Sequence, residues 1–141
     1  MSGECRRGGK VFQRPMVKQP VEFRLAAAGK LLEFHWAEVT AEAWHLWWAE
    51  WVRHESDVSV LSWLSLEMRG WLPLPEVILS AWREHAQVEE PDQKVRLLAW
   101  KVLAHQPIDL SVDIIRHLPS ESDPEVLEVM AQCFPASTPV P

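Results

Sequence analysis

The amino-acid sequence predicts a mainly α-helical protein, built as a short stack of antiparallel helix pairs or as a simple helical bundle, with a small β-hairpin near the N-terminus. Three observations lead to this prediction. Apolar residues recur at helical spacing after Thr40. Three segments that each begin with an aspartate can be aligned with one another. Residues 21–36 instead alternate between apolar and polar side chains, which is typical of strands.

The chain has the length of one domain and is rich in tryptophan. It has 141 residues, of which 48% are hydrophobic, with nine Trp and no Tyr. This aromatic content excludes a disordered chain, and the two distant cysteines, Cys5 and Cys133, exclude a disulfide scaffold. We expect one helical domain over residues 21–134, preceded by a basic, poorly ordered arm over 1–20 and followed by a proline-rich tail over 135–141.

Charge is unevenly distributed along the chain. The first 20 residues carry five basic side chains against Glu4, a net charge of +4, whereas the rest of the chain carries a net charge of −10. The acidic body would repel phosphates, which argues against a broad nucleic-acid surface. Contact with phosphate is expected only through the arm, which is otherwise a solvated terminus. The cationic residues of the arm are Arg6, Arg7, Lys10, Arg14 and Lys18.

Nothing in the sequence indicates a membrane or a secretory signal. A spanning helix needs roughly 20 mostly apolar residues, and no run of that kind is present. The basic N-terminus is not followed by the apolar segment of a signal peptide. Two lone cysteines fit a reducing compartment. The sequence therefore predicts a cytoplasmic protein without a membrane partner, and it does not indicate an oligomeric state.

Residues 21–36 are interpreted as a β-hairpin that turns at Gly29-Lys30. A helix is the alternative, because the run Ala26–Ala28 favours helix formation and several apolar residues of the segment share one helical face. The apolar residues of the two expected strands are Val21, Phe23 and Leu25, and then Leu32, Phe34 and Trp36.

Six helices are expected after Thr40. The first carries four tryptophans at i, i+3, i+4 and i+7, a stripe that we interpret mainly as core. The others are expected over residues 58–68, from Pro73 or Pro75 to Ala86, and over 92–105, 110–118 and 124–134. The tryptophans of the stripe are Trp44, Trp47, Trp48 and Trp51.

Part of the helical region repeats. Three helices begin after Asp57, Asp92 and Asp123, which are expected N-caps, and their starts lie 35 and 31 residues apart. A helix pair with this period indicates a helical solenoid, in which each pair buries its apolar face against the next. The helices between these starts also match, with Leu74, Ile78, Leu79 and Trp82 aligned to Leu110, Ile114, Ile115 and Leu118.

Residues 91–134 resemble HEAT and armadillo-like repeats. The resemblance rests on the Pro-Asp or Asp-Pro start of the helices, on Val95-Arg96 and on the leucine-rich second helix. It implies a superhelix of stacked helix pairs that serves as a rigid docking surface for other proteins.

The sequence carries no recognisable chemistry. It contains none of the common zinc-protease, nucleotide-binding or hydrolase motifs. The six histidines are dispersed, and Cys133 lies among apolar residues without a nearby cation that would activate a thiol. We therefore predict that the protein is not an enzyme and has no catalytic residues, metal site or cofactor.

The candidate partner-binding residues follow from the helix pattern. Trp71 lies between Gly70 and Pro73 in an expected loop, and it is the tryptophan least easily assigned to a core. If the apolar residues of the second helices face inward, the polar residues between them line one outer surface. These outward residues are Glu76, Ser80, Arg83, Ser111, Asp113 and Arg116.

The function predicted from these observations is a non-catalytic protein–protein interaction module or adaptor subunit. Two alternatives remain open. The acidic body is compatible with a small inhibitor or immunity-type protein that blocks a basic site, and the basic arm is compatible with a nucleic-acid-associated subunit of a complex.

Overall fold

The computed structural model describes residues 16–31, 42–87 and 89–133. These ranges are mainly α-helical, as predicted, and contain no strand. No helix within them is both long and apolar enough to cross a bilayer. The helices are α2 (Val21–Leu31), α3 (Glu42–His54), α4 (Val58–Met68), α5 (Glu76–His85), α6 (Gln93–Ala104), α7 (Ser111–His117) and α8 (Pro124–Gln132), with short 3-10 turns η1 (Met16–Lys18) and η3 (Leu118–Ser120).

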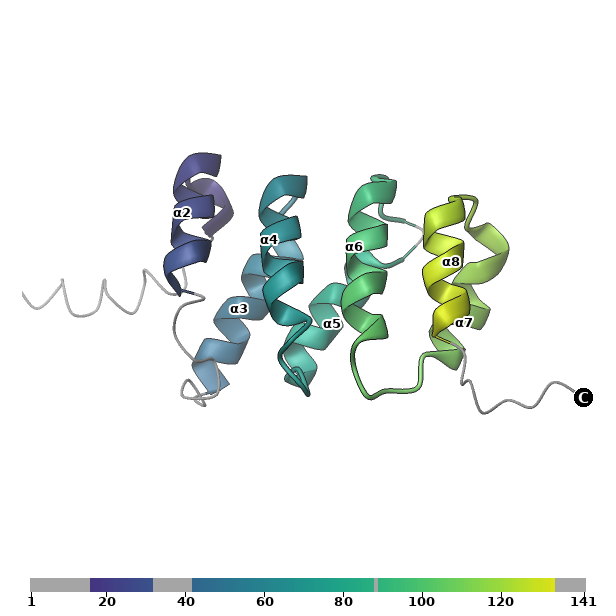
Figure 1. Ribbon diagram of the computed structural model, residues 1–141. Coiled ribbons are helices and arrows are strands. Elements are labelled where there is room, and N and C mark those ends of the chain that lie inside the picture. Colours follow the sequence, from purple (N-terminus) through teal and green to yellow (C-terminus); the bar gives the residue numbers. More distant parts are fainter. Residues whose placement is uncertain (1–15, 32–41, 88, 134–141) are drawn as a thin grey trace, which may run out of the picture.

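The helices form two layers (Figure 1). α2, α4, α6 and α8 stand side by side in one row, which we call the front row, and each contacts the next. α3, α5 and α7 lie behind it in a second layer, which we call the back layer; α3 packs on α5, and α5 also packs on α6. Successive helices therefore alternate between layers as the chain proceeds from one end of the row to the other.

An apolar core fills the space between the two layers. The largest fully buried side chains are Trp51, Trp82 and Trp100, one from each of three helices. The inward positions expected for α5 are confirmed, since Leu74, Ile78, Leu79 and Trp82 are all buried. The same alignment is only half right for α7. Leu110 and Ile114 are buried, but Ile115 and Leu118 are exposed because no described helix follows α7 in the back layer.

The three aspartates cap their helices as expected. The carboxylate of Asp57 accepts hydrogen bonds from two N–H groups of the first turn of α4, at 2.9 and 3.2 Å. Asp123 does the same for α8 at the same two distances, and Asp92 accepts one such bond at the start of α6. Because the three parallel helices share this start, residues at equal distance from the cap occupy equivalent positions in the front row.

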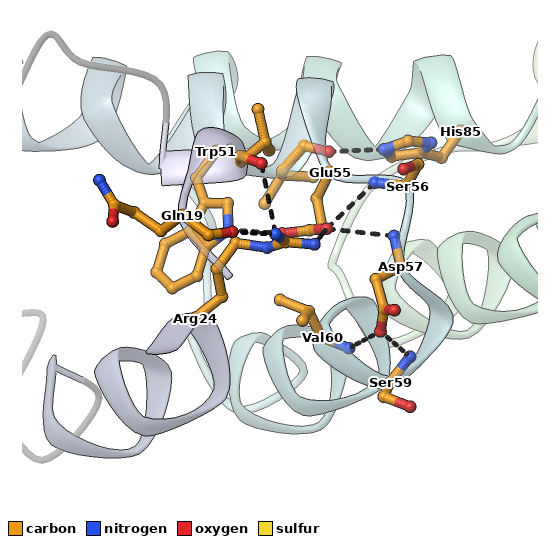
Figure 2. Close-up of polar contacts among 11 residues, drawn as sticks. Gln19, Arg24, Trp51, Glu55, Ser56, Asp57, Ser59, Val60 and His85 are labelled. Carbon is orange, nitrogen blue, oxygen red and sulfur yellow. Dashed lines mark hydrogen bonds and ion pairs between the residues drawn. The ribbon is translucent and has the colours of Figure 1, made fainter. Parts of the chain in front are cut away.

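A buried glutamate precedes the cap of α4 by two residues and joins three helices (Figure 2). The guanidinium of Arg24, on α2, donates two hydrogen bonds of 2.8 Å to the carboxylate of Glu55. The indole N–H of Trp51, on α3, donates a third, and the backbone N–H groups of Ser56 and Asp57 donate two more at the start of α4. The side chains of the Arg24–Glu55 pair are 9% and 0% exposed, so the charge of Glu55 is balanced entirely within the protein.

The same arrangement recurs before α8. Arg96 donates two hydrogen bonds of 3.0 Å to Glu121, whose carboxylate also accepts from the N–H groups of Ser122 and Asp123. Burial opposes the ionisation of Glu121, but the hydrogen bonds from Arg96 and from the two N–H groups outweigh it and lower its pKa. Glu121 is therefore held as a carboxylate at neutral pH.

The junction before α6 uses a histidine instead. Leu61 occupies the place on α4 that arginine occupies on α2 and α6. Glu90 precedes the cap of α6 and lies 3.0 Å from Nδ1 of His85, while Nε2 of the same ring lies 2.5 Å from the carbonyl oxygen of Val52 at the end of α3. At each of the three junctions, a glutamate thus lies two residues before the capping aspartate.

The hairpin predicted for residues 21–36 is wrong where the structure describes it, because residues 21–31 form helix α2. A strand would have placed Phe23 inward and Arg24 outward. The structure has the opposite arrangement, with Phe23 51% exposed and Arg24 buried against Glu55. Ala28, one turn beyond Arg24, is fully buried.

The second expected strand lies outside the described residues, as do the tail and most of the basic arm. Only Met16–Lys18 of the arm form a described element, η1, which contacts α2 and α3.

The first prediction concerns Glu55. Glu55→Gln removes the negative charge and leaves the buried guanidinium of Arg24 uncompensated, so the free energy of unfolding should fall by about 3–5 kcal/mol. Equilibrium unfolding in urea measures this loss. Glu67→Gln, at an exposed position of α4, is the matched control and should change stability by less than about 0.5 kcal/mol. Equal effects of the two substitutions would contradict the role given to Glu55.

The second prediction concerns the pH dependence of stability. Because the pKa of Glu121 is lowered in the folded chain, its contribution is complete above the ordinary glutamate pKa of about 4.3 and is lost as the pH falls through the lowered value. The stability difference between the native chain and Glu121→Gln should be largest near neutral pH and should disappear in strong acid. Urea unfolding over this pH range tests it, and a difference that persists in strong acid would be inconsistent with the lowered pKa.

Candidate interaction surface

The outward residues predicted on α5 and α7 come together in the back layer. Arg83, on α5, lies 3.7 Å from the carboxylate of Glu76 and 3.5 Å from that of Asp113, which is on α7. Ser80 and Ser111 are partly exposed, and Arg116 is exposed. The two helices therefore contribute to one surface, on which the central arginine is held between acidic groups of the same chain.

A second arginine of the back layer is paired in the same way. Arg53, on α3, donates to the carboxylate of Glu84 at 2.8 Å and to that of Glu50 at 2.5 Å. The hydrogen bond from Arg53 to Glu84 is the main cause of the raised pKa of Arg53. Each of the two arginines is thus paired with two carboxylates of the same chain, and this part of the back layer keeps an excess of acidic groups.

Trp71 is buried. The prediction that it binds a partner assumed that its side chain is exposed in a loop, and this assumption is wrong. Its side chain is only 9% exposed, and its ring packs edge-on against Trp48 with centroids 5.6 Å apart. The amide of Gln106 donates a hydrogen bond to the carbonyl oxygen of Trp71 and accepts one from the N–H of Leu74. These contacts fix the segment between α4 and α5 against the core.

The exposed tryptophan lies instead on α4. Trp63 is 48% exposed and Leu66, three residues later, is 58% exposed. The inward face of α4 is occupied by a separate set of side chains, so these two residues point away from the core. Apart from Glu67, α4 has no charged residue. The inward residues of α4 are Val60, Leu61, Leu64, Ser65 and Met68.

Cationic side chains accompany this apolar pair in the front row. Lys101 occupies the position on α6 that Leu66 occupies on α4, nine residues after the capping aspartate. Lys30 lies near the end of α2, and Arg69 directly follows α4. None of the three forms an ion pair with another residue in the described ranges. We call these five residues, Trp63, Leu66, Lys30, Arg69 and Lys101, the front-row patch.

The sequence does not single out the front-row patch, because Trp63 falls on one of the repeat helices, whose apolar residues are expected to pack in the core. The alignment carries only a partial signal. Trp63 lies six residues after its capping aspartate, whereas the buried position shared by the three helices lies seven residues after it, at Leu64, Ala99 and Met130. A side chain one residue away is rotated by about 100° around a helix, but the spacing alone does not decide the exposure of Trp63, because Val129 occupies the equivalent position on α8 and is buried.

The third prediction separates the two tryptophans. Trp71→Ala removes a buried ring and should lower the free energy of unfolding by about 3–5 kcal/mol. Trp63→Ala removes a half-exposed ring and should lower it by less than about 1 kcal/mol. Urea unfolding of both variants provides the comparison. A larger loss for Trp63→Ala than for Trp71→Ala would reverse the assignment of core and surface.

The described residues contain no reactive group that would indicate what the surface binds, and no related protein indicates it either. Across the described ranges, no group of three or more His, Cys, Asp or Glu side chains is arranged to hold a metal ion. Burial raises the pKa of the Cys133 thiol, which disfavours the nucleophilic thiolate. The expected phosphate contacts Arg6, Arg7, Lys10 and Arg14 lie outside the described residues, and Lys18 is exposed on η1.

Comparison of the chain with protein-family models, curated proteins and solved structures finds no match.

Proposed function

We propose that the protein is a non-catalytic interaction module, or adaptor subunit, whose front-row patch binds an apolar segment of another protein that carries acidic side chains. The observation that carries the proposal is the outward face of α4. Trp63 and Leu66 are half exposed there, on a helix that otherwise packs its apolar residues in the core.

The composition of α4 supports a docking role. Large apolar side chains on a helix are normally covered, but Trp63 and Leu66 are exposed on α4 together with the polar residues Ser59 and Glu67. Tryptophan is enriched among the residues that dominate binding energy at protein interfaces, because it buries a large area and keeps one N–H for a polar contact. A partner side chain or helix that covers Trp63 and Leu66 would complete the burial of α4.

The charges around the patch favour an acidic partner segment. Lys30, Arg69 and Lys101 form no ion pair with a described residue, whereas Arg53 and Arg83 in the back layer are already paired. Complementary charge across an interface raises the association rate and selects among partners. An apolar segment with Asp or Glu on either side would cover the two apolar side chains of the patch and would pair with its cationic side chains. The back layer, where Arg53 and Arg83 are surrounded by an excess of carboxylates, is a weaker candidate for binding an acidic segment.

The scaffold proposed for this module is a short HEAT or armadillo-like stack. The shared aspartate caps at Asp57, Asp92 and Asp123 support it, as does the regular alternation of helices between the two layers. In such a stack each helix pair contacts only its neighbours, so outward positions of the front row are held at fixed spacing. A fixed spacing reduces the ordering cost of binding an extended partner segment.

The fourth prediction tests the patch with a random peptide library selected against the full chain. The enriched peptides should combine large apolar residues with Asp or Glu. Their affinity should fall at least about tenfold for Trp63→Ala, as expected for a buried interface tryptophan, and should fall for Lys101→Glu. Fluorescence anisotropy with labelled peptides measures the dissociation constants.

The matched control lies in the back layer. Glu76→Ala changes an exposed side chain of the predicted α5 surface and should leave peptide affinity unchanged. Circular dichroism confirms that each variant is folded. Peptides whose affinity depends on Glu76 rather than on Trp63 would move the docking site to the back layer, and a library that yields no peptide sensitive to Trp63 would overturn the proposal.

A further inference from the structure

The four helices of the front row start in the same way, so their residues can be compared position by position. At the start of α2, the N–H of Arg24 donates a 3.0 Å hydrogen bond to the carbonyl oxygen of Pro20. The carbonyl oxygens of the capping aspartates of α4, α6 and α8 accept the equivalent bond, at 3.0 or 3.1 Å. Pro20 therefore takes the place of the capping aspartate on α2, and each position is counted from the cap.

The third residue after the cap is apolar in all four helices, but it is covered only where another helix precedes it in the row. Phe23 lies on α2, the first described helix of the row, and is 51% exposed. The equivalent residues of α4, α6 and α8 are Val60, Val95 and Val126, which are 0%, 2% and 0% exposed. The third position therefore faces the preceding helix of the row.

The eighth residue after the cap shows the reverse pattern. On α2, α4 and α6 it is Ala28, Ser65 and Trp100, each 0% exposed. On α8, the last described helix of the row, it is Ala131, which is exposed. The eighth position therefore faces the following helix. Five residues turn a helix by about 500°, so the third and eighth positions lie about 140° apart around the axis, as contact with two different neighbours requires.

We propose that the chain binds a second copy of itself head to tail, with α2 of one copy packed beside α8 of the next. Within the chain, α2 packs on α4, α4 on α6 and α6 on α8. The contact between copies continues this interface, which the row already contains three times (Figure 1). It would cover Phe23 of one copy and Ala131 of the other, the two positions that the ends of the row leave exposed.

The charges of the two ends favour this contact over one between identical ends. At the last end, Glu125 and Glu128 are exposed on α8, and neither forms an ion pair with a described residue. At the first end, α2 follows the basic residues 1–20, whose net charge is +4, and Lys18 is exposed directly before it. A two-fold contact would bring like charges together, whereas a head-to-tail contact brings the acidic end to the basic one.

The proposed contact is weak and open-ended. A contact between two short helices buries less than the roughly 800 Å² per partner of a standard stable interface. We therefore expect a dissociation constant on the order of 10 μM to 1 mM. Because the two contacting surfaces differ, every copy that joins leaves one surface free for the next.

Sedimentation equilibrium of the full chain across this concentration range tests the proposal. The average mass of the native chain should rise with concentration beyond that of a dimer. Phe23→Glu places a charge in the contact at the first end, and Ala131→Arg does so at the last end. Each variant alone should associate at least about tenfold more weakly than the native chain. Both positions are exposed, so both variants should fold, which circular dichroism verifies.

An equimolar mixture of the two variants provides the sharpest measurement. Phe23→Glu keeps an intact last end, and Ala131→Arg keeps an intact first end. The mixture should therefore form a one-to-one dimer with the affinity of the native contact, and nothing larger. A misfolded variant could not produce this recovery.

The outcomes that would overturn the proposal are distinct from those that test the docking function. Trp63→Ala changes an outward residue of α4 and should leave self-association unchanged, whatever its effect on peptide binding. Self-association that depends on Trp63 would place the contact at the front-row patch instead. A native chain that stays monomeric or stops at a dimer, or a mixture that associates no better than its separate components, would also contradict head-to-tail stacking.

Discussion

The arrangement of the first three helices depends on one carboxylate, that of Glu55. It is fully buried and receives hydrogen bonds from Arg24 on α2, Trp51 on α3 and the backbone at the start of α4. A buried charge is tolerated only where donors surround it, so each of these elements must be in place for the others to be stable. The apolar core supplies most of the favourable energy of burial, but it is not directional. The hydrogen bonds of Glu55 are directional, because its donors can reach the carboxylate in only one relative orientation of the helices.

The two layers treat their charges differently, and this difference bears on function. In the back layer, Arg53 and Arg83 bridge acidic groups of neighbouring helices and link α3, α5 and α7 across the surface. Exposed pairs of this kind add little stability, but they leave neither arginine free to pair with an acidic partner. In the front row, Lys30, Arg69 and Lys101 form no ion pair with a described residue, and Trp63 is half exposed. The central arginines of the back layer are thus already paired with acidic groups, whereas the front row has exposed apolar side chains and cationic groups without an ion pair among the described residues.

The parts of the fold that depend on neighbouring residues could be predicted from the sequence. The bounds of α4 and the capping roles of the aspartates were correct because a cap and a helical period are signals within about one turn. The hairpin was wrong although the local run Ala26–Ala28 also favoured a helix. The burial of Arg24, which separates the two alternatives, depends on a partner 31 residues away. Trp71 was misplaced for a similar reason, since its burial depends on Trp48 in another helix. Contacts of this range are set by packing, which a local pattern does not encode.

The buried charges have a consequence for how such a chain can change its length. Each pair of successive helices, α2–α3, α4–α5 and α6–α7, forms one unit that contains both side chains of the polar junction at its end: Arg24 with Glu55, His85 with Glu90, and Arg96 with Glu121. The side chain that faces each glutamate therefore comes from the same unit, although His85 also contacts the carbonyl oxygen of Val52 in the preceding one. A gene duplication or deletion of one whole unit would leave no orphaned buried carboxylate at the new seam and would need only a match of apolar surfaces. The stack is in this sense modular, and its present number of units is not fixed by its electrostatics.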